Sequence, residues 1–306
     1  MKNLTKIVAL SACVLAECGV GCGADFKPGS RIESPRVLAL QADKSFARPG
    51  EDISLTLLAA NPHDEPLEWA WATCTLPASS TVDDCIEVLD NDLQRFDPET
   101  DTLSVSIPSD VLDGVPAGKK PSALIGVVVV ACPGQLRSGD TLGVPTRCVD
   151  EQGNVRSIDD LEVGIKRIML RESDRNANPL IEEITWDGET WDEDQVQQAE
   201  ACKEETFAID DCSESLQRRI NVHTSDREAG RDEFGGDFTE QVIIQFYSTH
   251  GLFRDQVRIA EDADNRWVAQ QQDGGDATTA TLWLIARDDR GGVSWTTRRV
   301  ELQTGE

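Results

Sequence analysis

Short apolar segments separated by turn residues make up most of the chain, and this pattern constrains the fold most. Between Arg36 and Arg171, at least six segments show the two-residue alternation or the valine-rich composition of β-strands. Residues rich in Pro, Gly, Asn and Asp separate them, as at 48–51 and 61–66. Six strands with short connections in about 135 residues predict an antiparallel β-sandwich.

The same pattern returns in the last part of the chain. Its clearest piece is a hairpin, in which 281–286 and 293–297 flank the turn Asp288–Gly292. The glycines at the end of this turn supply the positive φ angles that a hairpin loop needs. The cross-strand pairing should bring three side chains together: Trp283, Ile285 and Trp295.

These patterns predict an all-β fold of two antiparallel sandwiches in tandem, over residues 36–172 and 178–302. One segment, Trp191–Glu205, has the residue composition of a short helix. We therefore expect one short helix in the second domain, inside an acidic, disulfide-bonded insertion at 190–214.

A resemblance supports this architecture. The opening PRVLALQADKSFARPGEDISLTLLAANPHDEPLEWAW and the closing LWLIARDDRGGVSWTTRRVEL resemble bacterial immunoglobulin-like domains, related to PKD and cadherin-type sandwiches. Such domains occur in tandem in Gram-negative surface lipoproteins. The resemblance implies an exported, anchored, non-enzymatic protein, and its cadherin side implies calcium at loop carboxylates between domains.

The first residues are built as an export signal. Lys2 and Lys6 precede an apolar run, Ile7–Ala16, and small residues follow. Ten apolar residues are too few to cross a bilayer core about 30 Å thick. We predict a signal peptide over residues 1–21.

Two cysteines near the end of this leader, Cys18 and Cys22, lie in sequences that resemble the lipobox of bacterial lipoproteins. Cleavage before Cys22 leaves an even set of six later cysteines, so Cys22 is the predicted lipidation site and Cys18 the alternative. Residues 22–35 then form a lipidated, flexible tether. Ordinary cleavage after Ala24 would instead release a free secreted protein. We expect a membrane partner through the lipid and an outer-membrane or cell-surface location, with the periplasm as alternative.

The six later cysteines are predicted to pair locally, because exported proteins meet an oxidising environment. The expected bonds are Cys74–Cys85, Cys132–Cys148 and Cys202–Cys212, although all 15 connectivities are formally open. Zinc is disfavoured, because the sequence has no CxxC motif and only three histidines: His63, His223 and His250.

The chain is strongly acidic, with 56 Asp and Glu against 29 Lys and Arg and a formal net charge of −27. Such a surface repels phosphate backbones, so we expect no nucleic-acid partner. It favours basic or cation-bridged partners and salt-sensitive association. Asp262 and Asp264 are weak calcium candidates, but solvation of an exposed loop is the favoured interpretation, and no metal site is predicted.

No motif of catalysis is present: the sequence lacks GxSxG, HExxH, GxxxxGK[ST] and GxGxxG. We expect no enzyme activity and no cofactor. The predicted function is adhesion, scaffolding or recognition of an envelope protein or glycan. The alternative is a carbohydrate-binding module or an accessory domain of a hydrolase system.

Tryptophans are the candidate ligand contacts. Three lie outside the clearest strand cores, where an exposed indole can stack on a sugar: Trp186, Trp191 and Trp267. Core packing is favoured even for these, because large aromatic side chains are seldom left exposed. The others are predicted to fill the sandwich interiors: Trp69, Trp71, Trp283 and Trp295.

Overall fold

The computed structural model describes residues 28–62, 65–77, 94–95, 102–113, 123–141, 144–171, 175–202, 208–225, 227–231, 236–270 and 279–303. The predicted signal peptide, both candidate lipidation cysteines and His63 lie outside these ranges. In the described part of the chain, none of the helices has the length and apolar character needed to span a membrane.

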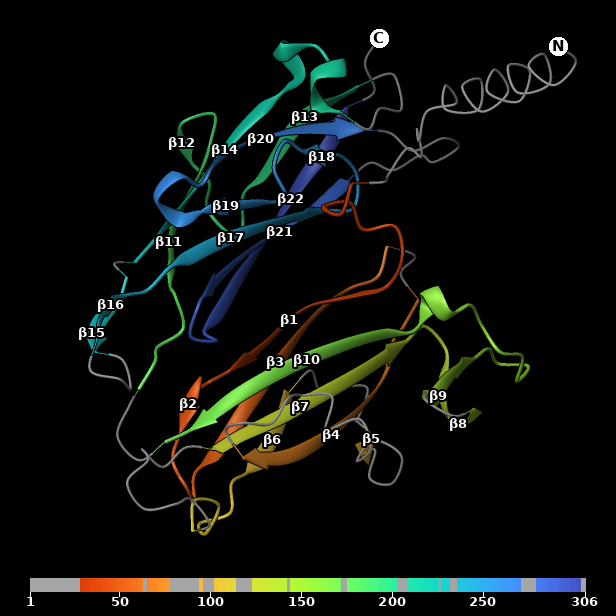
Figure 1. Cartoon of the computed structure of the whole chain (residues 1–306). Helices are drawn as coiled ribbons and strands as arrows, with labels where there is room; N and C mark the ends of the chain where they lie inside the picture. The colour runs from red at the N-terminus through yellow and green to blue at the C-terminus, as the bar shows by residue number, and fades with distance from the viewer. Residues whose placement is uncertain are drawn as a thin grey trace, which may run out of the picture.

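The N-terminal part forms two sheets and a small hairpin (Figure 1). One sheet has the order β1-β3-β6, with β1 at Arg36–Ala42, β3 at Asp52–Ala60 and β6 at Thr102–Ser106. The other has the order β2-β10-β7-β4-β5, with β2 at Phe46–Ala47, β10 at Glu162–Leu170, β7 at Ala123–Cys132, β4 at Glu68–Pro77 and β5 at Gln94–Arg95. The hairpin pairs β8, Gln135–Thr141, with β9, Val144–Val149, and the 3-10 helix η3, Ile158–Asp160, precedes β10.

The C-terminal part continues through one connected series of strands. Its order is β12-β11-β14-β20-β13-β22-β21-β17-β19, with β18 also paired to β20. The first half comprises β11 at Ile181–Trp186, β12 at Glu189–Thr190, β13 at Val196–Cys202, β14 at Arg218–Thr224 and β20 at Asp264–Gln270. The second comprises β17 at Val242–Ser248, β18 at Leu252–Phe253, β19 at Val257–Ile259, β21 at Thr279–Asp288 and β22 at Val293–Gln303.

Smaller elements complete the C-terminal part. A separate hairpin pairs β15, Ala229–Arg231, with β16, Asp237–Thr239. Three short 3-10 helices are η4 at Ile209–Asp211, η5 at Glu214–Leu216 and η6 at Ala260–Asp262.

Both parts repeat the same strand order. Lettered along the chain, β1-β3-β6 and β11-β14-β20 have the order A-B-E, whereas β10-β7-β4-β5 and β22-β21-β17-β19 have the order G-F-C-C′. In each part a further strand runs parallel to the G strand, β2 beside β10 and β13 beside β22. These are the sheet orders of an immunoglobulin-like sandwich, so the predicted all-β, Ig-like architecture is confirmed.

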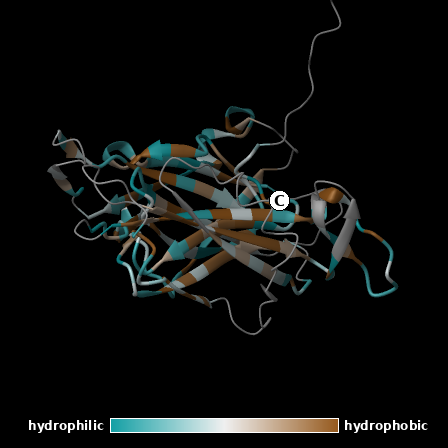
Figure 2. Ribbon diagram, turned by 60° about the horizontal axis from the view of Figure 1, so that its bottom comes forward, coloured by the Kyte–Doolittle hydropathy of each residue, from teal (hydrophilic) through white to brown (hydrophobic). Residues whose placement is uncertain are grey.

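The sequence alternation builds each interior. In the C-terminal sandwich Leu282 and Leu284 face the core, as do Ile220 and Val222 on the opposite sheet. In the N-terminal sandwich Leu55, Val127 and Ile168 form the core, and Trp69 and Trp71 pack against it as predicted. Figure 2 shows hydrophobic and hydrophilic residues alternating along several strands. Alternation of this kind is the two-residue period of strands with one buried face.

The predicted helix over Trp191–Glu205 is wrong where the chain is described. Residues Val196–Cys202 form β13, which pairs in parallel with β22 from Val196 opposite Arg299 onward. Ala199 and Ala201 face the core, whereas Glu200 between them is exposed. Pairing with a neighbouring strand and burial of the alanines therefore override the helical propensity of the segment.

The local disulfide pattern is confirmed where both partners are described. Cys132–Cys148 and Cys202–Cys212 are bonded, with Cα atoms 5.8 and 5.9 Å apart. Cys74 is also disulfide-bonded, and its predicted partner, Cys85, lies outside the described residues.

From Pro28 onward the structure differs from the predicted flexible tether over 22–35. The Ile32 side chain is fully buried in a cluster with residues of the C-terminal sandwich, among them Tyr247 and Trp283. A single buried isoleucine holds this segment, and one apolar residue leaves no periodic pattern in the sequence. The part of the predicted tether that the structure describes is therefore part of the folded body.

Candidate functional site

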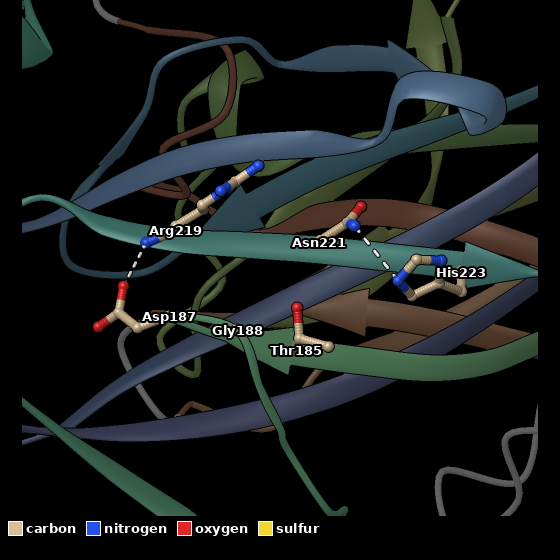
Figure 3. A pocket seen from close by; sticks show the side chains of 6 residues that line it. All are labelled: Thr185, Asp187, Gly188, Arg219, Asn221 and His223. Carbon is tan, nitrogen blue, oxygen red and sulfur yellow. Dashed lines mark hydrogen bonds between the residues drawn. The ribbon is translucent and has the colours of Figure 1, made fainter.

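The outer face of β11 and β14 carries a shallow polar depression of about 400 Å³ (Figure 3). Its lining residues come from these two strands and from the turn after β11: Thr185, Asp187, Gly188, Arg219, Asn221 and His223. Thr185 lies directly opposite Asn221 in the ladder. We call the outward side chains Thr185, Asn221 and His223 the recognition face.

Alternation along β14 sets the recognition face. Ile220 and Val222 are buried in the core, whereas Arg219 and His223 are exposed on the other side of the sheet. The neighbouring strand, β11, shows the same alternation, because its Ile184 and Trp186 point into the core. A sequence of alternating apolar and polar residues therefore places hydrogen-bonding groups in a row on a sheet surface.

A tight turn forms the rim of the depression. Asp187 has a φ of 52° and Gly188 a φ of 94°, so both adopt the left-handed conformation that Asp tolerates and Gly favours. The backbone N–H of Arg219 donates to Asp187 Oδ1 at 2.8 Å, and the backbone N–H of Asp187 donates to the Arg219 carbonyl at 2.8 Å. These two bonds fasten the turn to β14, as Figure 3 shows for the carboxylate.

The Arg219 guanidinium is already engaged beside the depression. Its Nε atom lies 2.7 and 2.8 Å from the two carboxylate oxygens of Asp264 on β20. This hydrogen bond raises the pKa of Arg219 above its ordinary value. An anionic ligand would have to compete with Asp264, so the depression is better suited to a polar or cationic group.

His223 and Asn221 are linked to each other. Asn221 Nδ2 lies 3.2 Å from His223 Nε2, so the ring and the amide are held side by side on the strand (Figure 3). Thr185 adds a hydroxyl, a group that both donates and accepts. The arrangement therefore offers hydrogen bonds to a polar partner.

The three candidate stacking tryptophans lie in the core, as the favoured core-packing interpretation predicts, and their indoles are not exposed to a ligand. Trp186 is 7% exposed, Trp191 1% and Trp267 0%. The ring centroids of Trp186 and Trp191 are 4.8 Å apart, in an edge-on arrangement. Trp191 Nε1 donates to the Gln195 carbonyl at 2.9 Å, and Trp267 Nε1 to Ser248 Oγ at 3.3 Å. Internal partners for the indole N–H groups allow these rings to be fully buried.

Trp283 and Trp295 also differ from prediction, because they lie outside the sandwich interior. Ile285 pairs with Trp295 in register, as the hairpin pattern predicts. Both belong to a cluster between the two sandwiches, with Leu38 from the N-terminal part. Alternate residues of β21 therefore bury opposite faces: Leu282 and Leu284 the interior, Trp283 and Ile285 the cluster between sandwiches.

Both weak calcium candidates, Asp262 and Asp264, pair with arginine side chains. Asp264 binds Arg219, and Asp262 Oδ2 lies 2.6 Å from an Arg258 guanidinium nitrogen. Within the described ranges, no three acidic, His or Cys side chains are grouped so that they could hold a metal ion.

The charged contact between the two sandwiches, which we call the joint, is a feature that sequence reasoning missed. Arg290, in the turn between β21 and β22, contacts the rings of Phe46 and Phe238, with its guanidinium carbon 4.8 and 4.6 Å from their centroids. The same side chain pairs with Glu240 Oε1 at 3.2 Å and Glu228 Oε2 at 3.3 Å. Burial raises the pKa of Glu240 above its ordinary value, with Asp288 and Glu228 adding to the shift.

Further polar contacts of the joint involve the connecting segment before β11. Asn178 Nδ2 donates to the Ala42 carbonyl at 2.8 Å, and Asn178 Oδ1 accepts from the Val293 backbone N–H at 3.0 Å. Lys166 Nζ donates to the Gly291 carbonyl. Burial, with the nearby charge of Arg287, lowers the pKa of Lys166 to about 8. One connecting asparagine therefore binds both sandwiches.

Neither of two sequence comparisons with known proteins finds a match. No family model matches the sequence. No curated protein matches it either.

Several solved structures share a weak likeness. The D00-D0 domain of Intimin has 7% identity over 87% of this chain and 100% of that one, with a TM-score of 0.23. The N-terminal Ig1-2 module of the Drosophila receptor protein tyrosine phosphatase DLAR has 8% identity over 89% and 100%, with a TM-score of 0.25. A structure from a 1.5-MDa bacterial ice-binding adhesin has 11% identity over 89% and 67%, with a TM-score of 0.21. At such TM-scores the likeness carries no argument, and the fold rests on the strand order described above.

Proposed function

We propose that the chain is an exported lipoprotein of the bacterial envelope, anchored through Cys22, whose two tandem Ig-like domains act as a non-catalytic adhesion, scaffolding or recognition module. The repeated A-B-E and G-F-C-C′ strand orders support the two domains. The bonds Cys132–Cys148 and Cys202–Cys212 support export, because disulfides persist in oxidising compartments. An outer-membrane or surface location, with the periplasm as alternative, completes the proposal.

The observation that carries the recognition role is the polar depression on a sheet face whose buried side is fully used for packing. Its groups are fixed by the strand ladder and by the Asp187 turn, so a partner would meet preorganised donors and acceptors. The carbohydrate-binding alternative loses its stacking residues, because Trp186, Trp191 and Trp267 are buried. Polar contact with a basic protein partner fits the net charge of −27 better.

Binding through the recognition face is tested by measuring which envelope proteins the full chain retains. The double variant Asn221→Ala with His223→Ala removes two groups of the face without touching the core. Ser54→Ala, on an exposed position of β3, is the matched control. We expect loss of the retained partner with the double variant and retention with the control, and weaker binding as salt rises. Equal retention by the double variant would contradict the role of the face.

The anchor is tested separately by the mass of the N-terminal peptide from a bacterial host. Lipidation at Cys22 predicts a peptide that begins at this cysteine and carries acyl chains, and processing that globomycin blocks. An unmodified N-terminus would end the lipoprotein proposal, and acylation at Cys18 would move the anchor.

A further inference from the structure

The hairpin of β8 and β9 places two arginines directly opposite each other. Arg137 pairs in register with Arg147, and both side chains are exposed. Like charges in directly opposite positions destabilise a strand pair. Within the described residues, neither guanidinium pairs with a carboxylate, and Arg137 donates to the side-chain carbonyl of Gln135. In a chain with a net charge of −27, folding of the hairpin does not explain this local excess of positive charge.

An exposed apolar side chain lies on the same side of the hairpin as the two arginines. Val155 forms an isolated antiparallel bridge with Val149, and residues two apart along a strand share a face, so Val155 lies on the side of Arg147. Val155 is 64% exposed. Leu136 and Cys148 point the other way, into a cluster against the sandwich. We call three outward side chains the hairpin face: Arg137, Arg147 and Val155.

Two residues beside the recognition face complement the hairpin face. Glu183 lies opposite His223 in the ladder, and its carboxylate accepts from the Thr190 hydroxyl at 2.8 Å; within the described residues it has no basic partner. Leu180 is 59% exposed, and its carbonyl accepts from the Ser225 N–H. Because Ser225 lies two residues beyond His223, Leu180 lies on the outward side of the sheet. A carboxylate, an aliphatic side chain and the polar depression therefore share one surface.

The hairpin face and the recognition face lie on different sides of the molecule. Figure 1 shows β8 and β9 projecting at the right of the N-terminal sandwich, whereas β11 and β12 lie at the left of the C-terminal one. One copy therefore cannot bind its own hairpin, but two copies can meet head to tail. A contact between two different surfaces of one protein repeats into an open chain unless its rotation closes a ring.

We propose that the recognition face binds the hairpin face of a second copy of this chain, with the arginines meeting Glu183 and the depression, and Val155 meeting Leu180. This inference rests on the proposed recognition role and names its partner. At physiological ionic strength the Debye length is about 8 Å, so repulsion between the distant acidic surfaces of two copies is largely screened. Charges in direct contact keep their attraction. A two-stranded hairpin buries little area, so we expect weak association that high protein concentration reveals.

Sedimentation velocity of residues 23–306, which contain every described element, tests the association at rising protein concentration. The hairpin variant is Arg137→Glu with Arg147→Glu. Its control, Arg48→Glu with Arg299→Glu, changes two exposed arginines elsewhere and shifts the net charge equally. We expect concentration-dependent oligomers for the native chain and the control, and an association constant at least tenfold lower for the hairpin variant. Equal association of the two variants would overturn the proposal.

A mixture of two variants tests the head-to-tail arrangement. The face variant, Glu183→Ala with Asn221→Ala, keeps an intact hairpin, and the hairpin variant keeps an intact recognition face. Each alone should sediment as a monomer. Mixed at equal amounts, they should form a dimer and nothing larger, because one intact surface of each kind remains. A mixture that stays monomeric would overturn the pairing of these two surfaces. Circular dichroism verifies that both variants remain folded.

A photo-crosslinking amino acid in place of Val155 locates the contact directly. We expect a cross-linked dimer whose joined peptides come from β11 or β14 of the second copy. The same group in place of Ser104, which is exposed on β6, should give no such product. A dimer joined mainly through other elements would overturn the proposed docking.

Failure of self-association is distinguishable from failure of the proposed recognition role. A native chain that stays monomeric at every concentration overturns self-association. If that chain still retains an envelope protein, and Asn221→Ala with His223→Ala loses it, the recognition role stands with a different partner. If neither a second copy nor an envelope protein binds, both proposals fail.

Discussion

The guanidinium of Arg290 lies over the ring of Phe46, 4.8 Å from its centroid, and joins the two sandwiches through one side chain. Its guanidinium carbon also lies 4.6 Å from the ring centroid of Phe238, and its Nη1 atom pairs with Glu228 and Glu240. A planar cation can stack on rings with its faces and pair with carboxylates at its edge, which a lysine cannot do. The turn between β21 and β22 is therefore one of the contacts that hold the two sandwiches together.

Replacing Arg290 with Met should lower the free energy of unfolding by about 2 to 4 kcal/mol, because Glu240 is left buried without its partner. The matched control is Arg254→Met, which removes an exposed pair with Asp210 and should cost about 1 kcal/mol or less. Urea unfolding of each variant measures the two losses in the free energy of unfolding. A loss for Arg290→Met no larger than that of the control would contradict the role of the joint.

Lys166 makes stability depend on pH on the alkaline side. Burial lowers the pKa of Lys166 from 10.5 to about 8, so the folded state resists carrying the charge. Below about pH 8 both states are protonated and the cost of burying the charge is fully present. Between about pH 8 and 10.5 only the unfolded state keeps the proton, so the contribution of this group to stability rises with pH.

The variant Lys166→Met should flatten that alkaline rise, while Lys44→Met, at a surface lysine, should leave it unchanged. Denaturant midpoints measured at intervals from pH 7 to pH 11 give the comparison. A rise of the same size in Lys166→Met would assign the effect to another group.

Glu51 makes stability depend on pH on the acid side. Hydrogen bonds from Arg175, with a second from the Arg48 backbone N–H, lower the pKa of Glu51 from 4.5 to about 2. The stabilisation is present above about pH 4.5 and is lost as the pH falls toward 2. Because the pair is partly exposed, its contribution is on the order of 1 kcal/mol. Arg175→Gln should reduce the acid-dependent loss, and an unchanged acid profile would exclude this pair as its source.

Trp191 provides a test of the core assignment. Its replacement by Ala should lower the free energy of unfolding by about 3 to 5 kcal/mol, as expected for a buried indole. Calorimetry or urea unfolding measures the loss. Unchanged stability together with lost binding to a glycan would instead return Trp191 to the class of ligand contacts.

Local patterns predicted much of the fold. The alternation in β3 and β14, the hairpin pairing of Ile285 with Trp295, and the pairs Cys132–Cys148 and Cys202–Cys212 all depend on residues near in sequence or on a simple period. Such features are set by the local chain, so one sequence is sufficient to find them.

The misses share a physical cause, which is contact between distant segments. The segment with helical composition forms β13 because it pairs with β22 and buries Ala199 and Ala201 in the core. Trp283 and Trp295 lie between sandwiches because a second apolar surface covers the outer side of their sheet. A strand buried on both faces has no polar side to reveal which tryptophan points inward.

The recognition face and the joint were missed for a related reason. Asn221 and Thr185 look like ordinary outward residues until the ladder sets them opposite each other. The one available signal was the alternation through 219–223, which contains the only described His on a strand. Arg290 lies within the predicted hairpin turn Asp288–Gly292, and no local pattern indicates the joint because its partners Phe46 and Glu240 are far away in sequence.

The central claim is that two Ig-like sandwiches are locked into one body, and differential scanning calorimetry of the full chain with intact disulfides tests it most directly. We predict a single transition whose calorimetric and van't Hoff enthalpies agree, since the clusters around Trp283 and Arg290 join both sandwiches. Two separate transitions, unchanged in Arg290→Met, would contradict the claim.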